Sequence, residues 1–399
     1  VYITTPTGYL TEREHGTIPR FYLPVDKSTP DRSYNFRLKR NPLNDTKHTM
    51  IVQADPQITS PDDIKQYKVF LNDMNQDLEK YRGKRDVTAL DCGDIVGDSP
   101  WMFPATIEAQ SIIDIPIYRV IGNHDMTYGG RSYETSYSKY EELFGPIYYS
   151  FNKGKAHYIV INNNFYVNRD YQYIGYIDER TFAWMEQDLS YVPDDHLVFV
   201  IAHIPFSSSE ELKWNTLQQD ETSNARGLFE MLQGRNAHLL TGHSHFNHNV
   251  CFNDSLMEHN TAAVCGIWWK ADVCVDGTPI GYGVYDIDGN NVKWRYKSSF
   301  KPADYQATVY TAGSSPEFPE DIIANVWNYD KLWKVEWLEN GKVMGEMTQF
   351  EGYDPEARAI CADKKRVVYD WIYPVKTAHL FRATPVNPSA NITVRVTDR

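Results

Sequence analysis

The stretch IYRVIGNHD, residues 117–125, joins a short apolar run to the polar sequence Gly122–Asp125. The run Ile117–Ile121 is rich in β-branched residues and is typical of a buried strand. The glycine that follows ends the strand, so Asn, His and Asp come just beyond its carboxyl end. In open α/β sheets ligands bind outside the carboxyl ends of the strands. This stretch therefore predicts a strand that delivers polar groups to a site.

The same arrangement recurs on both sides of this stretch. Six apolar runs have the length and residue types of buried strands: Met50–Ala54, Val87–Leu90, Ile117–Ile121, Tyr158–Ile161, Leu197–Ala202 and His238–Leu240. Five of them lead into Asp, Asn, Gln or His residues, in three cases through a glycine. These segments are Asp55 and Gln57, Gly93 and Asp94, Gly122 to Asp125, Ala202 and His203, and Gly242 to His245. One match of this kind is weak evidence, whereas five in the same register predict one polar edge.

Helical patterns separate several of these runs, which favours an α/β sheet. The predicted helices are Pro61–Tyr81, Pro100–Ile112, Ser132–Leu143, Asp178–Leu189 and Ser223–Gln233. Ser60, which precedes Pro61, and Asp178 are suitable N-caps for two of them.

After residue 255 strand patterns replace the helical ones. Thr261–Trp269, Ile280–Ile287 and Val292–Tyr296 are predicted strands that can complete a second sheet. Residues 301–399 carry further strand patterns separated by Gly and Pro, which predicts a small all-β domain resembling a sandwich. We therefore expect three parts: residues 1–46, an N-terminal β segment and possible truncated domain; residues 47–300, an α/β domain; and residues 301–399, a C-terminal all-β domain.

The composition is that of a globular protein with an acidic surface. The chain has 399 residues, 42% of them hydrophobic, and a formal net charge of −13. Nucleic-acid binding needs a basic face, and no run of Lys and Arg provides one, so no nucleic-acid-binding surface is expected. No stretch approaches the ~20 apolar residues of a transmembrane helix.

The compartment is less strongly indicated. The chain starts at Val1 without Met and shows no signal peptide, which is compatible with a mature protein, and we expect an extracytoplasmic location, periplasmic or secreted. Five cysteines without a CxxC motif do not predict a disulfide framework, and one pair among Cys251, Cys265 and Cys274 stays open.

The polar edge has the composition of a metal site. Carboxylate, amide and imidazole groups without thiolates indicate a hard-to-borderline ion, and their number is enough for two. Asp94 is the natural bridging carboxylate, because it is a lone acid after Gly93, where the backbone can approach closely. Two ions ~3.5–4 Å apart can hold a phosphoryl group, lower the pKa of a bound water and stabilise an in-line transition state.

In this order, Asp-x-Gln, Gly-Asp, Gly-Asn-His-Asp, Val-x-x-His and Gly-His-x-His resemble the motifs of the calcineurin-like metallophosphoesterase superfamily. The resemblance covers about residues 47–300 and implies a two-sheet α/β sandwich. It implies that one ion is bound by Asp55, Gln57, Asp94 and His245, and the other by Asp94, Asn123, His203 and His243. It also implies that His124 faces the substrate, where it stabilises phosphoryl oxygens or protonates the leaving group. His124 and Asp94 are therefore the candidate catalytic residues.

Two positions depart from the common pattern of the superfamily. Its first motif most often has His where this chain has Gln57, and an amide oxygen is a weaker ligand than imidazole for Fe, Mn or Zn. Purple acid phosphatases have Tyr where this chain has Gly97, so a coloured Fe–tyrosinate pair is not expected. The flanking sequences Cys265–Trp269 and Asp276–Pro279 look like those of bacterial calcineurin-like phosphohydrolases with N- and C-terminal β domains.

These features predict a metal-dependent phosphoesterase that hydrolyses a phosphate mono- or diester, with a metal-bound water or hydroxide as the nucleophile. The expected cofactors are two divalent or trivalent ions of Mn, Fe or Zn, and the expected substrate is a small phosphate ester or a phosphoprotein. Two alternatives stay open. One is a surface or glycan-binding protein with a degenerate metallophosphoesterase domain, and the other is a pyrophosphatase or nucleotidase that uses the same site.

Overall fold

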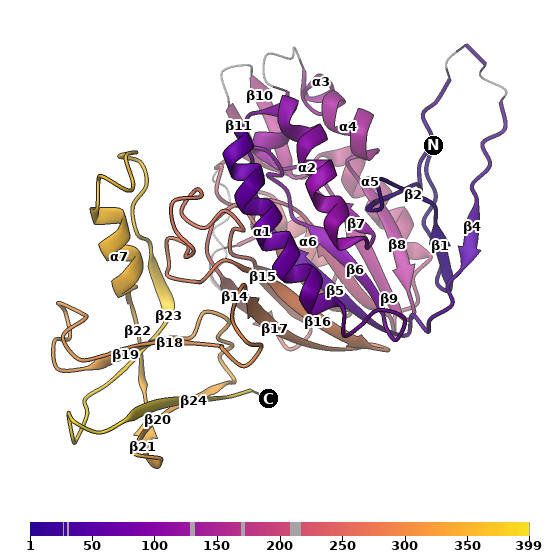
Figure 1. Ribbon diagram of the computed structural model, residues 1–399. Coiled ribbons are helices and arrows are strands. Elements are labelled where there is room, and N and C mark those ends of the chain that lie inside the picture. The colour runs from indigo at the N-terminus through magenta and orange to yellow at the C-terminus, as the bar shows by residue number, and fades with distance from the viewer. Residues whose placement is uncertain (27, 30–31, 128–131, 169–171, 208–216, 399) are drawn as a thin grey trace.

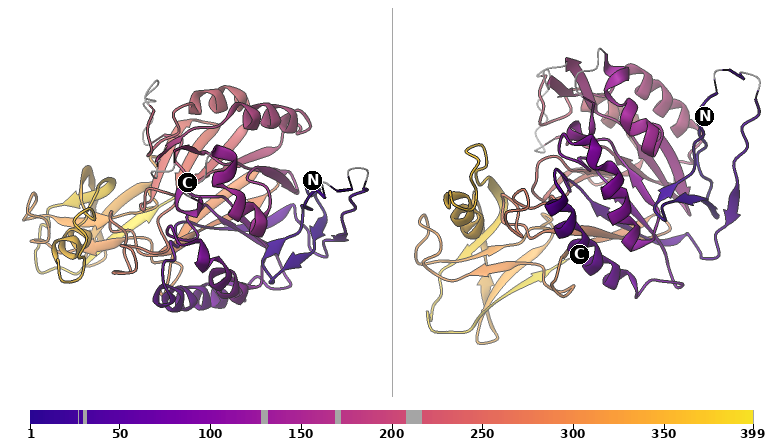
Figure 2. Two further views of the ribbon diagram at one scale, coloured as in Figure 1. Left: turned by 90° about the horizontal axis from the view of Figure 1, so that it is seen from above. Right: turned by 45° about the horizontal axis from the view of Figure 1, so that its top comes forward.

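A computed structural model describes residues 1–26, 28–29, 32–127, 132–168, 172–207 and 217–398. Its centre is a sandwich of two sheets with helices on both outer sides, seen from above in Figure 2. A β-rich C-terminal region lies at one end of the sandwich and the N-terminal strands lie at the other (Figure 1). The predicted two-sheet α/β sandwich is confirmed.

The first sheet has five strands in the order β17-β16-β5-β6-β7. They are β5 (Lys47–Gln53), β6 (Asp86–Asp91), β7 (Ile117–Arg119), β16 (Gly281–Asp288) and β17 (Asn291–Ser298). Strands β5, β6 and β7 are parallel to one another, while β16 and β17 are antiparallel to their neighbours. The carboxyl ends of the three parallel strands therefore meet at one edge.

The second sheet has six strands in the order β14-β15-β13-β12-β9-β8. They are β8 (Tyr149–Lys153), β9 (Ala156–Val160), β12 (Leu197–Ile201), β13 (Asn236–Thr241), β14 (His248–Asn253) and β15 (Leu256–Asn260). Strands β9, β12, β13 and β15 are parallel, so this sheet also collects carboxyl ends at one edge.

Helices cover the outer faces of both sheets. The longer ones are α1 (Pro61–Leu78), α2 (Phe103–Gln110), α4 (Ser138–Phe144), α5 (Glu179–Ser190) and α6 (Ala225–Met231). The shorter ones are α3 (Tyr133–Ser136) and the 3₁₀ turns η1 (Pro100–Met102), η2 (Ser111–Ile113) and η3 (Asn123–Asp125). Ser60 and Asp178 each accept a hydrogen bond from a backbone N–H in the first turn of α1 and α5, as the sequence predicted.

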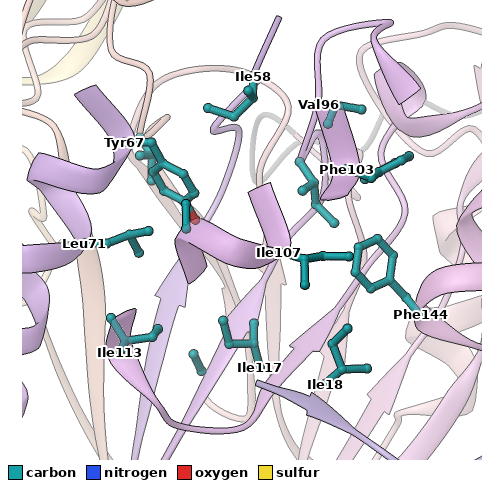
Figure 3. Packing of buried hydrophobic residues seen from close by; sticks show 14 of the residues in the cluster. Ile18, Ile58, Tyr67, Leu71, Val96, Phe103, Ile107, Ile113, Ile117 and Phe144 are labelled. Atoms are coloured by element: carbon teal, nitrogen blue, oxygen red, sulfur yellow. The ribbon is translucent and has the colours of Figure 1, made fainter. Parts of the chain in front are cut away.

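Three apolar layers hold the sandwich together. Figure 3 shows the layer between the helices α1 and α2 and the first sheet, where Tyr67 and Phe103 pack among Ile, Leu and Val side chains. Between the two sheets, Phe151 stacks on Tyr118 with ring centroids 3.8 Å apart and an interplanar angle of 10°. The third layer lies between the second sheet and the helices α5 and α6. These three layers fix the two sheets and their helices relative to one another.

The N-terminal residues form short strands on the end of the sandwich. They are β1 (Tyr9–Thr11), β2 (Arg13–Glu14), β3 (Ile18–Pro19) and β4 (Leu38–Arg40). Phe21 is buried in the layer between the two sheets, so this segment packs on the core of the sandwich. A further hairpin, β10 (Asn164–Asn168) with β11 (Gln172–Gly175), follows the second sheet's strand β9.

The C-terminal region contains a four-stranded and a three-stranded sheet. Its strands are β18 (Thr308–Tyr310), β19 (Ile322–Asn325), β20 (Lys334–Glu339), β21 (Lys342–Glu346), β22 (Thr348–Tyr353), β23 (Lys376–Ala383) and β24 (Ile392–Thr397). The sequence predicted an all-β module, and the structure adds one helix to it, α7 (Pro355–Ala362), capped by Asp354. The division of the chain at residues 46 and 300 into separate domains stays a prediction.

The predicted strand Thr261–Trp269 is wrong. The chain makes successive turns there, and Gly266, Trp268 and Trp269 have positive φ angles of 54°, 44° and 60°. Such angles are incompatible with an extended strand, so the β-branched and aromatic content of this segment was misleading. The turns instead bring two tryptophans next to the polar edge of the sandwich.

A buried polar cluster joins the C-terminal region to the sandwich. This anchor cluster consists of Asp276, in the segment before β16, with Asn325, Asp354 and His379. The two ring nitrogens of His379 lie 2.7 Å from Asn325 Oδ1 and 3.0 Å from Asp276 Oδ2. Asn325 Nδ2 donates to the Asp276 carbonyl at 2.9 Å and to Asp354 Oδ2 at 2.8 Å. These bonds attach the C-terminal region at a defined place.

Two negative findings complete the description. Within the described ranges, no helix combines the length and the apolar character needed to cross a membrane. The five cysteines, all of them described, are unpaired, so the pairing left open among Cys251, Cys265 and Cys274 does not occur.

Candidate metal centre

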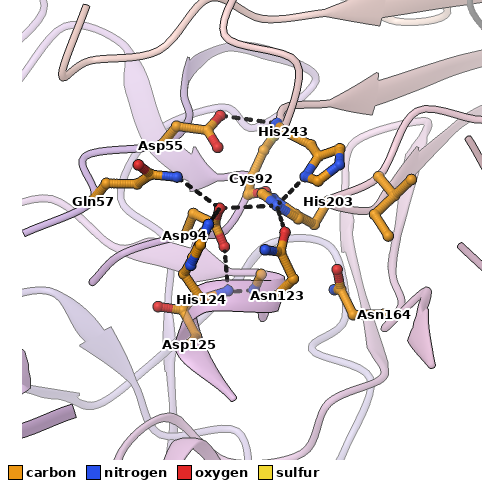
Figure 4. Close-up of polar contacts among 12 residues, drawn as sticks. Asp55, Gln57, Cys92, Asp94, Asn123, His124, Asp125, Asn164, His203 and His243 are labelled. Carbon is orange, nitrogen blue, oxygen red and sulfur yellow. Dashed lines mark hydrogen bonds and ion pairs between the residues drawn. The ribbon is translucent and has the colours of Figure 1, made fainter. Parts of the chain in front are cut away.

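All seven predicted ligands come together at the carboxyl ends of parallel strands, and Figure 4 shows six of them. The first sheet delivers the oxygen ligands: Asp55 and Gln57 after β5, Asp94 after β6 and Asn123 after β7. The second sheet delivers the imidazoles: His203 after β12, and His243 and His245 after β13. The site therefore spans the seam between the two sheets.

Backbone hydrogen bonds beyond the strand ends bring these loops together. Asp55 N donates to the Gly93 carbonyl at 3.0 Å, and Gln57 N donates to the Asp94 carbonyl at 2.8 Å. The carboxylate of Asp125 accepts from Val96 N and from Gly122 N, both at 2.9 Å. Asp125 thus ties the loop after β6 to the loop after β7, and its role is to position the ligands.

Glycine is required at two points of close approach. A Cβ atom at Gly93, where φ is +98°, would lie 2.7 Å from His203 Nδ1. A Cβ atom at Gly122 would overlap the carboxylate of Asp94. Both glycines let the backbone of one loop lie against a ligand from another, which is the role the sequence predicted for Gly93.

Backbone strain is concentrated at the same place. Twelve non-glycine residues of the described chain have positive φ, and five of these are predicted ligands. Their φ angles are 53° at Asp55, 41° at Gln57, 52° at Asp94, 71° at His243 and 58° at His245. Each such residue costs of order 1–3 kcal/mol, and this cost is tolerated mainly where function requires the conformation.

His203 has the geometry of a metal ligand. Its Nδ1–H donates to the Cys92 carbonyl at 2.8 Å, which fixes the ring and directs the Nε2 lone pair into the site (Figure 4). That nitrogen lies 3.0 Å from Asn123 Oδ1, 3.3 Å from Asp94 Oδ2 and 3.2 Å from His243 Nδ1. Four atoms with lone pairs therefore crowd one point.

The short distances among these four atoms test whether the residues could bind a cation. One proton can bridge only a pair of these atoms, whereas an ion with bonds of ~2.0–2.2 Å can contact all four. Asp94, His203 and His243 offer ligand atoms that all lie within 4.8 Å of one another. The donor set of oxygen and imidazole groups suits a first-row transition ion, so the residues fit the group.

A second part of the site lies on the other side of Asp94. Asp55 Oδ2 accepts from His243 N at 2.9 Å, while the buried Oδ1 accepts no hydrogen bond from any described residue and lies 3.6 Å from His245 Nε2. Gln57 Nε2 donates to Asp94 Oδ2 at 3.0 Å. Turning the amide of Gln57 by 180° brings Oε1 to the same position, so the side chain can face this carboxylate or an ion.

Buried charge makes the site electrostatically demanding. Burial raises the pKa of Asp55, and burial together with the charge of Asp94 raises the pKa of Asp125 to about 8. Burial would raise the pKa of Asp94 too, but the neighbouring His203 and His124 bring it far below its usual value. Burial and the charge of His203 lower the pKa of His243 to about 3, which leaves its imidazole neutral. Burial lowers the pKa of His203, but Asp94 outweighs it and raises this pKa to about 9. Without an ion the site therefore holds the Asp94 carboxylate against a charged imidazole, and a bound cation would take over that charge.

His124 lies at the rim of the site and is partly exposed. Its backbone N–H donates to Asp94 Oδ1 at 2.8 Å, and its Nε2 lies 4.0 Å from Asp94 Oδ2. Its Nδ1 lies 2.9 Å from Asp98 Oδ2, so the Asp98 carboxylate contacts this ring directly. Burial lowers the pKa of His124, but Asp94 and Asp98 outweigh it and raise this pKa to about 9.

Asn163 acts by positioning His203. Its Oδ1 accepts from the backbone N–H of His203 at 3.3 Å and of Ile204 at 3.1 Å. Asn164 donates to the Ile121 carbonyl at 2.7 Å and is likewise a structural residue. Trp268 and His248 line a cavity next to His243.

The amino-acid sequence matches two family models. A model described as calcineurin-like phosphoesterase matches residues 50–247, and one described as the C terminal of calcineurin-like phosphoesterase matches residues 258–399. The second match begins in β15 and includes β16 and β17 of the first sheet. No curated protein matches the chain.

Solved structures with a similar fold include three phosphatases or nucleotidases. A dimetal phosphatase from Danio rerio is 12% identical with a TM-score of 0.45, over 63% of this chain and 96% of that one. A purple acid phosphatase from yellow lupin seeds is 14% identical with a TM-score of 0.44, over 63% of this chain and 51% of that one. A 5′-nucleotidase from Candida albicans is 15% identical with a TM-score of 0.38, over 66% of this chain and 53% of that one.

Proposed function

The chain belongs to the calcineurin-like phosphoesterase family and is therefore a metal-dependent phosphoesterase, for which we propose hydrolysis of a small phosphate ester at a centre of two metal ions. The observation that carries the two-ion proposal is the crowding of lone pairs on both sides of Asp94. On one side His203 Nε2 faces three ligand atoms within 3.3 Å, and on the other the buried Asp55 Oδ1 faces His245 Nε2 at 3.6 Å.

The chain's own residues divide into two ligand sets. Asp94, Asn123, His203 and His243 hold one ion, and Asp55, Gln57, Asp94 and His245 hold the other. Asp94 is shared, because its Oδ2 lies 3.3 Å from His203 Nε2 and 3.0 Å from Gln57 Nε2. When bound, Mn, Fe or Zn supplies the positive charge that neutralises phosphoryl oxygens and lowers the pKa of a water ligand.

His124 acts on the substrate from the rim. Its Nδ1 is held by Asp98, so its Nε2 is directed toward the space above Asp94. In that orientation Nε2–H donates a hydrogen bond to a phosphoryl oxygen or to the departing alcohol oxygen, where charge develops in the transition state. Asp98 is a positioning residue in this scheme.

Metal loading followed by a phosphate-release assay tests the proposal. The protein is stripped with EDTA, reconstituted with Mn, Fe or Zn, and assayed on p-nitrophenyl phosphate and bis(p-nitrophenyl) phosphate, with metal content measured by mass spectrometry. We expect two ions per chain and hydrolysis that depends on them, and the ratio of the two substrates separates monoester from diester activity. His203→Ala should remove both metal and activity, while His196→Ala, at a partly exposed position beside Asp195 and away from the site, should retain them.

Hydrolysis by the EDTA-treated protein, or a fully loaded protein that releases no phosphate from either ester, would contradict the proposal. The second outcome would favour the alternative of a binding protein that retains the metal site but has lost the reaction.

A further inference from the structure

A cavity of about 550 Å³ lies directly beside the candidate metal centre. One wall is formed by His243 and Ser244 of the loop after β13, and the opposite wall by residues 371–375 of the C-terminal region. The volume lies within the range of roughly 300–1,000 Å³ that is usual for small-molecule sites. A phosphate ester bound at the metal centre can therefore extend its alcohol part into this cavity.

The wall from the C-terminal region presents aromatic rings to the cavity. Trp371 is 56% exposed and Tyr373 is 64% exposed, although side chains of this size are usually buried. Trp371 meets Trp268 edge to face, with ring centroids 4.8 Å apart and an interplanar angle of 89°. The two indoles form a corner, and Tyr369 stacks on Trp371 with ring centroids 5.5 Å apart. The exposed part of Trp371 lines the cavity and forms its platform.

This aromatic corner is fixed relative to the metal centre. Trp268 has a positive φ of 44°, and its ring stacks on His245 with centroids 4.4 Å apart. The backbone around Trp371 is attached to the sandwich on both sides, because Arg366 Nε donates to the Lys270 carbonyl at 2.6 Å and Val375 N donates to the Val275 carbonyl at 3.0 Å. The platform therefore needs little rearrangement when a ligand binds.

The polar groups of the cavity indicate what the platform binds. The lining includes the carboxylates Asp220 and Glu221 and the amides Gln218 and Asn260, and its described members include no Lys or Arg. Carboxylates only accept hydrogen bonds, so they suit ligand hydroxyl groups. Among the described lining residues a second phosphate would find no cation, and the acids would repel it.

We propose that this cavity holds a sugar ring, so that the substrate is a sugar phosphate carrying a single phosphate group. This inference rests on the proposed phosphoesterase function. A sugar ring has one face of C–H groups that lies on a single aromatic platform, and hydroxyl groups around its edge that donate to carboxylates and amides. A nucleobase is best held between two parallel rings, whereas Trp268 and Trp371 are perpendicular.

The test compares substrates that differ only in the alcohol. Phosphate release from glucose 1-phosphate, glucose 6-phosphate, adenosine monophosphate and methyl phosphate is measured with wild type, Trp371→Ala and Tyr373→Ala. We expect kcat/KM for the sugar phosphates to fall about tenfold in each variant, mainly through KM, because one aromatic contact is lost. Methyl phosphate, whose alcohol is too small to reach the platform, should be hydrolysed at an unchanged rate.

Two control variants make the comparison specific. Tyr191→Ala removes a tyrosine that is 78% exposed and lies far from this cavity, and it should leave all four substrates unaffected. Trp371→Phe keeps a smaller ring and should recover most of the loss. Binding of glucose 1-phosphate to metal-loaded protein, measured by calorimetry, should weaken in Trp371→Ala in the same proportion as KM rises.

Each other outcome is decisive. Equal losses on methyl phosphate and the sugar phosphates, or no loss on either, would overturn the sugar site while leaving the phosphoesterase function intact. Adenosine monophosphate as the substrate most affected by Trp371→Ala would assign the cavity to a nucleoside instead. If no ester is hydrolysed, the proposed function has failed, and calorimetry with glucose 1-phosphate then decides the sugar site separately, with no measurable binding overturning it.

Discussion

Two clusters bury His, Asp and Asn side chains: the metal edge, formed by the seven predicted ligands of the candidate metal centre, and the anchor cluster. Their polar atoms are arranged in opposite ways. In the anchor cluster each ring nitrogen of His379 contacts a single partner atom, Asn325 Oδ1 at 2.7 Å and Asp276 Oδ2 at 3.0 Å. At the metal edge, three ligand atoms crowd the single Nε2 of His203 within 3.3 Å. The first arrangement is complete as a hydrogen-bonded network, and the second becomes complete when a cation is bound.

The backbone shows the same contrast. Five ligands of the metal edge have positive φ, whereas none of the four anchor residues, all of which are described, is among the positive-φ positions. A structural cluster gains stability from its bonds and needs no strained backbone. Burial of His and Asp alone therefore does not mark a functional site, but burial with strain and crowded acceptors does.

Asp94→Asn should produce the largest effect on the metal edge. It removes the shared carboxylate, so we expect kcat/KM on p-nitrophenyl phosphate to fall more than about 10³-fold. The metal content, measured by mass spectrometry, should fall as well.

Asp194→Asn, at a surface position with a side chain 97% exposed, is the control for a change of charge alone and should leave activity unchanged. Wild-type metal content in Asp94→Asn would contradict the assignment of Asp94 as the ligand shared by both ions.

His124→Ala should have the next largest effect. His124 is assigned to the substrate and not to a metal, so kcat should fall about 10²–10³-fold while metal content stays at the wild-type level. Asp98→Asn, which keeps the shape but weakens the contact with Nδ1, should give a smaller loss in the same direction. Loss of metal in His124→Ala, measured by mass spectrometry, would show that its role has been wrongly assigned.

Asp276→Ala should have the reverse profile, with an effect on stability and little on chemistry. It leaves His379 buried without its carboxylate, which costs about 3 kcal/mol of unfolding free energy. Denaturant titration of the metal-free protein measures this loss, and metal content should be unchanged. Asp370→Asn, fully exposed in the C-terminal region, should have no measurable effect on stability. Unchanged stability of Asp276→Ala would contradict the description of the anchor cluster as structural.

The sandwich could be predicted from the sequence because the patterns that specify it lie within short stretches of the chain. The β-branched runs, the caps at Ser60 and Asp178, and the ligand residues after the strands all depend on residues close together in the chain. The shared polar edge followed from one general rule about parallel strands. Eight predicted strands of the sandwich and all of its predicted helical regions have counterparts in the structure.

Features made by distant parts of the chain were not predicted. The contact between Asp276 and His379 spans 103 residues, and that between Trp268 and Trp371 a similar distance, so no local pattern could reveal them. Trp268 and Trp269 were assigned to a strand because aromatic residues favour strands, whereas packing against His245 and Tyr67 holds them in the left-handed region. Helix α7 was missed because its eight residues lie among strong strand patterns.

The smallest predicted effect concerns Gln57, a predicted ligand whose side-chain amide already donates to Asp94 Oδ2 at 3.0 Å. To bind an ion this amide must turn and give up that bond, and an uncharged amide oxygen is a poorer ligand than imidazole for Mn, Fe or Zn. The ion beside Asp55 and His245 should therefore dissociate first on dialysis, and Gln57→His should slow its loss by about tenfold, as expected for a change of one supporting group. Gln57→Ala separates ligation from hydrogen bonding. If Gln57 binds the ion, Gln57→Ala weakens that ion's binding, whereas if it serves only Asp94, Gln57→Ala and Gln57→His both leave its affinity as in wild type. Equal affinity of the two ions in wild type would sink the argument, because it would mean that the departure at this position has no consequence for the centre.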